Sequence, residues 1–183
     1  MDNEILMTMS GTFILVVIAK SSSLSLSALQ SGGVLPGLVG SLAGGLGVMT
    51  GIIVTGAASG GHINPAVSVA MVACKKLPLV KLPAYLLGQY LGAGVGALVV
   101  LGIYSGHHAM ALATYPGLVQ DILPQLLDQT TATFLLILGI FSVVDQELNP
   151  PSLLVGFVVV GVSLALGPNA GAAMNPAVDF MPR

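Results

Sequence analysis

The sequence predicts an all-α membrane protein, built as an inverted-repeat helical bundle with two short helices that enter the bilayer and turn back. Three observations lead to this prediction. The 183 residues are 55% hydrophobic and 7% charged, with a mean hydropathy of +0.97, whereas soluble domains carry about 25% charged residues. The chain contains five long apolar runs. The tetrapeptide Asn-Pro-Ala-Val occurs twice, at 64–67 and 175–178.

The composition also excludes several classes of function. A net charge of −2 with five Lys and Arg residues argues against a nucleic-acid partner, which requires a basic face. The single Cys74 excludes an internal disulfide framework and a Cys-based metal cluster. His107 and His108 are adjacent and have no third ligand in sight, so we expect no metal site. No Ser-His-Asp arrangement or paired carboxylates suggest an enzyme, and no cofactor is implied. The first four residues lack the positive region of a signal peptide.

Each apolar run is predicted to be a membrane-spanning helix, because about 20 residues cross the roughly 30 Å hydrocarbon core. The runs cover residues 5–29, 34–56, 83–104, 126–144 and 152–167. The first run is interrupted by Lys20, which we expect to snorkel toward an interface or a cavity; a role in an ion pathway is the alternative. The glycines at 40, 44, 45, 47 and 51 and at 88, 92, 94 and 96 predict close helix packing.

The lysines predict the orientation in the membrane. Lys75, Lys76 and Lys81 lie together between the second and third runs, and clustered basic residues mark the cytoplasmic side. The amino terminus is then cytoplasmic and the 105–125 loop is external. We expect a multi-pass integral membrane protein, in the plasma membrane.

Each Asn-Pro-Ala-Val copy predicts the start of a short helix. Asn is a favoured N-cap, and Pro suits the first helical position because its missing N–H would have no partner there. The helices therefore begin at Asn64-Pro65 and Asn175-Pro176. The predicted short helices are 64–75 and 175–183. The 11 residues after the first Asn extend about 16 Å, which is half of a membrane.

Both short helices follow an apolar run that ends in glycine-rich chain, which permits a tight return. Non-helical backbone at membrane depth must be buried in protein or line a watery cavity. One isolated Asn-Pro pair would be an ordinary helix start after a turn. Two copies in the same context instead predict two re-entrant half-helices that enter from opposite faces and meet cap to cap.

The two halves of the chain predict an inverted repeat. "GTFILVV" at 11–17 is similar to "ATFLLIL" at 132–138. We expect a first repeat at 1–104, an external loop at 105–125 and a second repeat at 126–183. In such repeats the functional site lies at the interface between the halves.

At these residues the chain resembles a known family. "SGGHINPAV" and "GPNAGAAMNPAVDFMPR" are similar to the paired signatures of the major intrinsic proteins, the aquaporins and aquaglyceroporins. The similarity runs from about residue 11 to 183. "ATYPG" at 113–117 and "DFMPR" at 179–183 resemble the glycerol-conducting branch.

The resemblance implies a right-handed bundle, a homotetramer with one pore per subunit, and a passive channel for water and small neutral solutes such as glycerol or urea. The pore motifs would be Asn64, Pro65 and Ala66 with Asn175, Pro176 and Ala177, and the two Asn amides would face the lumen. The family has six spans, so this chain is expected to lack the sixth.

The resemblance also implies which residues form the narrow outer constriction. By alignment these are Gly44, Ser163, Ala172 and Val178, and the last position is usually Arg. A ring of small side chains without a cation predicts a wider opening. The alternative is that Val178 marks a degenerate copy that does not conduct.

Other positions carry weaker expectations. His62 either lines the inner vestibule or is a packed, hydrogen-bonded side chain. Asp179 either contacts solute or stabilises the first turn of its half-helix. The buried carboxylates that brace the re-entrant loops in many relatives correspond to Thr8 and Gln129 here, and the shorter Thr8 makes the first brace doubtful.

Two other classes of function stay open. An ion-coupled transporter would also use broken helices, but it usually needs membrane-embedded carboxylates. A non-conducting structural membrane protein would keep the bundle and lose the pore. For a channel, two helix N-termini facing each other would repel cations.

Overall fold

The computed structural model describes residues 2–28, 34–105, 112, 114, 118 and 121–181. In these residues the regular structure is helical throughout. The elements are α1 (Asp2–Ala28), α2 (Val34–Ser59), α3 (Pro65–Ala73), the 3-10 turn η1 (Leu79–Lys81), α4 (Leu82–Ile103), α5 (Ile122–Asp145), α6 (Pro151–Ala170) and α7 (Pro176–Phe180). Within the described part of the chain, five of these helices are long and apolar enough to cross a membrane, as the five runs predicted.

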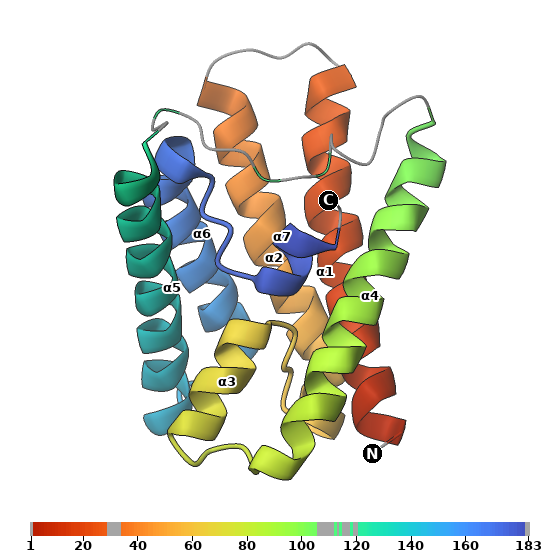
Figure 1. Ribbon diagram of the computed structural model, residues 1–183, viewed down its shortest axis with the longest axis vertical. Helices are drawn as coiled ribbons and strands as arrows, with labels where there is room; N and C mark the ends of the chain where they lie inside the picture. Colours follow the sequence, from red (N-terminus) through yellow and green to blue (C-terminus); the bar gives the residue numbers. More distant parts are fainter. Residues whose placement is uncertain are drawn as a thin grey trace.

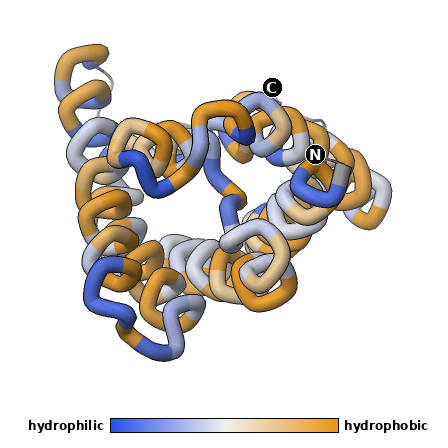
Figure 2. The backbone as a smooth tube through the Cα atoms, turned by 90° about the horizontal axis from the view of Figure 1, so that it is seen from below, coloured by the Kyte–Doolittle hydropathy of each residue, from blue (hydrophilic) through white to orange (hydrophobic). Residues whose placement is uncertain are grey.

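The long helices run side by side, with the two short helices between them (Figure 1). Packing follows the order α4, α1, α2, α6, α5, while α3 contacts both α4 and α5, and α7 contacts α4 and α3. Viewed along the bundle, the long helices form a ring with chain crossing its interior (Figure 2). The short helix α3 therefore joins the two open ends of the helix row, and α7 packs against α4 and α3.

Glycines let neighbouring helices approach closely. A Cβ added at Gly92 of α4 would lie 2.2 Å from the carbonyl oxygen of Met9 in α1. A Cβ at Gly45 of α2 would lie 2.6 Å from the carbonyl oxygen of Gly156 in α6. Helix association in lipid depends on such close backbone contact, so these glycines fix which helices are neighbours.

The expected packing role is wrong for two glycines of α2. Cβ atoms built at Gly40 and Gly44 meet no atom within 4 Å. These positions are one turn apart and face open space, whereas Gly47 and Gly51 on the other side of the helix contact α1. The difference comes from the rotation of α2 about its axis. The face with Gly47 and Gly51 lies against α1, whereas the face with Gly40 and Gly44 touches no neighbouring helix.

Two helix ends differ from the sequence prediction. The first short helix ends at Ala73 with Cys74 as its C-cap, not at Lys75. The fifth run continues as α6 to Ala170, through Pro168. Some residues named in the sequence analysis lie outside the described part of the chain. They are His107, His108, most of 113–117, and residues 182 and 183.

Candidate functional site

The first half-helix begins at Asn64. Its backbone is extended, with φ −148° and ψ 120°, and its Oδ1 accepts a hydrogen bond from the Ala66 N–H at 2.9 Å. Gly60 and Gly61 have φ of 73° and 71°, a region open to glycine, and they turn the chain from α2 into the re-entrant segment. The predicted cap and its glycine return are both present.

The second half-helix begins in the same way at Asn175. Its Oδ1 accepts from the N–H groups of Ala177 at 3.2 Å and Val178 at 3.4 Å. The backbone that leads into this half-helix is more strained than in the first copy, because Ala172 and Met174 have φ of 43° and 45°. Non-glycine residues in this region cost of order 1–3 kcal/mol each and persist only where surrounding structure holds them.

Each asparagine side chain donates a hydrogen bond to the loop that precedes the other asparagine. Asn64 Nδ2 donates to the carbonyl oxygen of Met174 at 2.9 Å, and Asn175 Nδ2 donates to the carbonyl oxygen of Ile63 at 2.9 Å. Each acceptor immediately precedes the opposite asparagine. The two half-helices thus meet cap to cap. A carboxamide nitrogen carries two N–H donors, so each amide has a second donor that these bonds do not use.

A cavity of about 900 Å³ opens beside these amides. Both Asn64 and Asn175 line it, and its remaining wall is mostly apolar. The four positions expected for the constriction also line it: Gly44, Ser163, Ala172 and Val178. The structure therefore brings the asparagines and the four alignment-derived positions to one cavity.

The other motif residues lie behind this wall. Pro65 and Ala177 are buried, Ala66 is partly buried and Pro176 is exposed. None of the four is among the residues that line the cavity. Their contribution is to start the helices that carry the asparagines.

The second loop is held by a clamp from α5. Gln129 Nε2 donates to the carbonyl oxygen of Ala170, and its Oε1 accepts from the Ala173 N–H at 2.9 Å. This confirms the expected brace. It holds the backbone on either side of Ala172, which explains how the left-handed conformation of that residue is maintained.

Asp128, beside Gln129, adds a contact that sequence reasoning missed. Its Oδ2 accepts from Asn169 Nδ2 at 2.7 Å, and the side chain is buried. Its other oxygen is also buried, and it has no hydrogen-bond partner among the residues that the structure describes. A carboxylate inside an apolar run was the available signal, but the sequence does not show which face of the helix carries it.

The first loop is braced differently. Thr8 is fully buried, yet its Oγ1 donates to the carbonyl oxygen of Glu4 in its own helix at 2.8 Å. Instead, α4 supplies the contacts: Gln89 Nε2 donates to Ser68 Oγ at 2.9 Å, and Tyr85 Oη donates to the Ser59 carbonyl oxygen at 3.0 Å. The only signal for Gln89 was an amide within an apolar run.

His62 and Asp179 lie outside the wall of the cavity. His62 Nδ1 is 3.1 Å from Ser68 Oγ, and its ring meets Tyr85 edge-on, with centroids 5.0 Å apart. This is the packed, hydrogen-bonded alternative. Asp179 is in the first turn of α7, where its negative charge interacts favourably with the positive end of the helix dipole.

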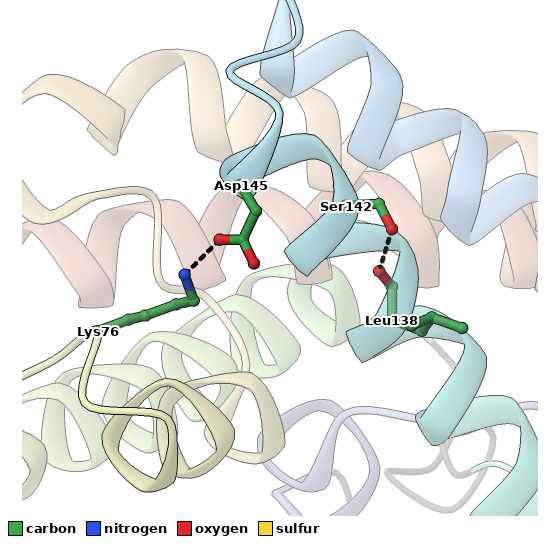
Figure 3. Close-up of polar contacts among 4 residues, drawn as sticks. All are labelled: Lys76, Leu138, Ser142 and Asp145. Atoms are coloured by element: carbon green, nitrogen blue, oxygen red, sulfur yellow. Dashed lines mark hydrogen bonds and ion pairs between the residues drawn. The ribbon is translucent and has the colours of Figure 1, made fainter.

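Two ion pairs connect the segment between α3 and α4 to the ends of other helices at the same end of the bundle as the amino terminus. Lys76, in the turn after α3, pairs with Asp145 at the end of α5 (Figure 3) and lies over the Phe141 ring, 5.7 Å from its centroid. Lys81 Nζ lies 2.9 Å from Glu4 Oε1. Exposed pairs contribute about 0–1 kcal/mol each, so they set local geometry more than stability.

Comparisons with known proteins agree with this geometry. Residues 3–183 match the model of the major intrinsic protein family. The chain is 37% identical over 203 residues to Aquaporin-9 of Homo sapiens, covering 98% of this chain and 68% of that protein. It is 34% identical over 194 residues to Aquaglyceroporin-2 of Rhizophagus irregularis, covering 94% of this chain and 61% of that protein.

A solved structure has the same fold. The aquaglyceroporin from Plasmodium falciparum superposes with a TM-score of 0.90 at 28% sequence identity, covering 100% of this chain and 79% of that one. Sequence and fold agree over nearly the whole length, and the chain is a multi-pass integral membrane protein belonging to the major intrinsic protein family.

Proposed function

We propose that this chain forms a passive channel for water and small neutral solutes such as glycerol, and that the solutes pass through the 900 Å³ cavity. The observation that carries the proposal is the pair of crossed amides, Asn64 and Asn175, on the cavity wall. The family comprises channels, not enzymes, and several relatives are named aquaglyceroporins.

The chemistry of the wall suits neutral solutes with hydroxyl groups. The apolar surface accepts carbon atoms, and the second N–H of each asparagine can donate to a passing oxygen. Weak, serial contacts of this kind let a solute enter and leave. The amino-terminal end of α3, capped by Asn64, carries partial positive charge toward the cavity and disfavours cations.

We further propose that Gly44, Ser163, Ala172 and Val178 form a constriction that is wider than one with an arginine. All four have small or medium side chains, and Gly44 has open space beyond its Cα. Glycerol and urea would therefore pass more freely than in a channel that selects for water alone.

A matched pair of glycine variants tests the pathway. Gly44→Phe fills space beside the cavity, whereas Gly102→Phe fills equally open space on α4 away from it. In proteoliposomes under an outward glycerol gradient, Gly44→Phe should reduce flux on the order of tenfold, with Gly102→Phe unchanged. Equal flux in both variants would contradict the assignment.

The same assay separates the competing functions. A passive channel conducts glycerol without any ion gradient, whereas an ion-coupled transporter needs one. If the full-length wild-type protein shows no flux of water, glycerol or urea above that of empty liposomes, the channel proposal is wrong and a structural membrane protein is favoured.

Assembly and orientation are also proposals. We propose a homotetramer in the plasma membrane, a cytoplasmic amino terminus, and repeats at 1–104 and 126–183 joined by an external loop. Support for the orientation comes from the Lys81–Glu4 ion pair, because it keeps the amino terminus beside the basic loop. Native mass spectrometry tests the tetramer, and protease protection of an amino-terminal tag tests the orientation.

A further inference from the structure

We propose that Asp128 of α5 is a positioning residue for solute selectivity: through Asn169 it holds one wall of the cavity back, so that solutes larger than water can pass. The proposal rests on the channel function above. Asp128 is not among the residues that line the cavity. It acts through the end of α6, which forms part of the cavity wall.

A carboxylate stands where the rest of the buried face of α5 is apolar. The buried residues of this helix are Asp128, Ala132, Leu136, Ile140 and Val143. They face the interior of the bundle, since Leu136 and Ile140 line the cavity. A buried carboxylate is costly in a spanning helix and is typical of functional positions. One oxygen of Asp128 has no hydrogen-bond partner among the described residues, so local packing does not explain a carboxylate here.

The cavity wall is attached to α5 at two neighbouring residues. Every residue at 167–175 lines the cavity except Asn169 and Ala170. Asn169 Nδ2 donates to Asp128 Oδ2 at 2.7 Å, and the carbonyl oxygen of Ala170 accepts from Gln129. Hydrogen bonds to a carboxylate are stronger than those between neutral groups. Consecutive side chains of α5 therefore hold consecutive residues of the wall, on the side away from the cavity.

The two attachments hold different parts of the wall. Gln129 also binds the loop that follows α6, whereas Asp128 holds the last turn of α6. That turn contains Pro168, which has no N–H to donate within the helix. The carbonyl oxygens of Pro168 and Asn169 accept from the N–H of Leu118. The bond between Asp128 and Asn169 thus fixes the point where α5, α6 and the segment at Leu118 meet.

Loss of this attachment should narrow the cavity. The last turn of α6 faces the cavity on one side, where Gly167 and Pro168 line it, and is bonded to α5 on the other. Ala172, a proposed constriction residue, follows three residues after Asn169. Its left-handed backbone persists only while surrounding structure holds it. Without Asp128 the wall relaxes toward the cavity, and glycerol loses room before water does.

The test measures the ratio of glycerol to water permeability in proteoliposomes, after subtraction of the permeability of empty liposomes. This ratio does not depend on how much protein has folded and inserted, so a loss of stability alone leaves it unchanged. Asp128→Leu removes the acceptor of Asn169. The matched control is Asp121→Leu, at the exposed N-cap of the same helix, where the side chain makes no capping hydrogen bond.

We expect Asp128→Leu to lower the glycerol-to-water ratio on the order of tenfold, because small changes in the room at a site discriminate solutes by such factors. Asp121→Leu should keep the wild-type ratio. A wild-type ratio in a conducting Asp128→Leu channel would overturn the positioning role and leave the channel function intact. If wild type conducts no glycerol above empty liposomes, both proposals are wrong.

An exchange of the two partners provides a rescue. Asn169→Asp places two carboxylates side by side, and their repulsion should also lower the ratio. Adding Asp128→Asn restores one donor and one acceptor with their roles reversed, so the ratio should return to within about twofold of wild type. A double variant that keeps the low ratio of Asn169→Asp would contradict the proposal, since exchanging the partners of a direct contact repairs it.

A further double variant guards against misfolding. Asp128→Leu combined with Asn169→Leu leaves neither a buried charge nor an unpaired amide, and replacing both partners of a buried polar contact by apolar groups is often tolerated. If the single variants do not fold, this one decides the outcome. It should melt like wild type in detergent and still have the lowered ratio. A wild-type ratio would show that the bond does not set selectivity.

Discussion

Asn64 donates a hydrogen bond to the backbone immediately before Asn175, and Asn175 donates one to the backbone immediately before Asn64. Both distances are 2.9 Å. In each side chain the oxygen caps its own helix while the nitrogen holds the opposite loop. One residue type thereby starts each half-helix and joins it to the other, which places the two caps side by side.

Replacing one of these amides by a carboxylate tests the crossing. Asn64→Asp keeps the oxygen that caps α3 and removes the donor to Met174. We expect unfolding in detergent to become easier by about 1–3 kcal/mol, because the buried acceptor loses its partner. Circular dichroism during heating measures this. Asn149→Asp, on the exposed surface, is the control, and equal melting of the two variants would contradict the crossed bonds.

Removing the clamp of α5 should loosen the second loop. Gln129→Leu deletes the bonds to Ala170 and Ala173, and the left-handed backbone at Ala172 then loses its support. Hydrogen exchange at the Ala173 amide should become faster, with a loss of about 1–3 kcal/mol in local stability. Gln146→Leu, an exposed change at the end of α5, should not alter exchange there. Unchanged protection of Ala173 in Gln129→Leu would count against the clamp.

A single methyl group at a helix crossing should be poorly tolerated. Gly92→Ala places a Cβ 2.2 Å from the carbonyl oxygen of Met9, so α4 and α1 must move apart. The expected cost is about 1–3 kcal/mol, read as a lower melting temperature in detergent. Gly102→Ala, where a Cβ meets nothing within 4 Å, should melt like wild type. A similar fall in both variants would contradict the packing role.

An arginine at Val178 should narrow the proposed constriction. Val178 lines the cavity, and the longer, charged side chain would occupy space that solute needs. We expect Val178→Arg to lower glycerol flux more than water flux, because the larger solute is excluded first. Val178→Leu adds less bulk and no charge, and it serves as the control. Unchanged glycerol flux in Val178→Arg would show that this residue lies off the pathway.

Local sequence signals predicted much of this fold. Apolar runs gave five spanning helices, and the Asn-Pro pairs gave two half-helix starts, because burial in lipid and N-capping depend on residues close together in the chain. The resemblance then supplied Gly44, Ser163, Ala172 and Val178, which the fold gathers at one cavity. It also supplied Gln129 as a brace.

The sequence was less informative about which side of each helix packs against a neighbouring helix. It marked Gly40 and Gly44 as packing residues, although they face open space. It left the brace at Thr8 in doubt, and it did not identify Gln89 of α4, which contacts the first half-helix instead. A spanning helix is apolar on its lipid face and on its packing face alike. Hydrophobic periodicity therefore does not fix its rotation.

By itself, the sequence determined that this chain enters a membrane and starts two short helices inside it, because hydrophobicity, proline geometry and asparagine capping act over a few residues. Only the tertiary structure decided that Asn64 and Asn175 bind each other's loops, that Asp128 meets Asn169, and that Lys20 joins the cavity wall. Those contacts connect residues far apart in the chain, and they follow from the rotation and close approach of helices that small glycines permit.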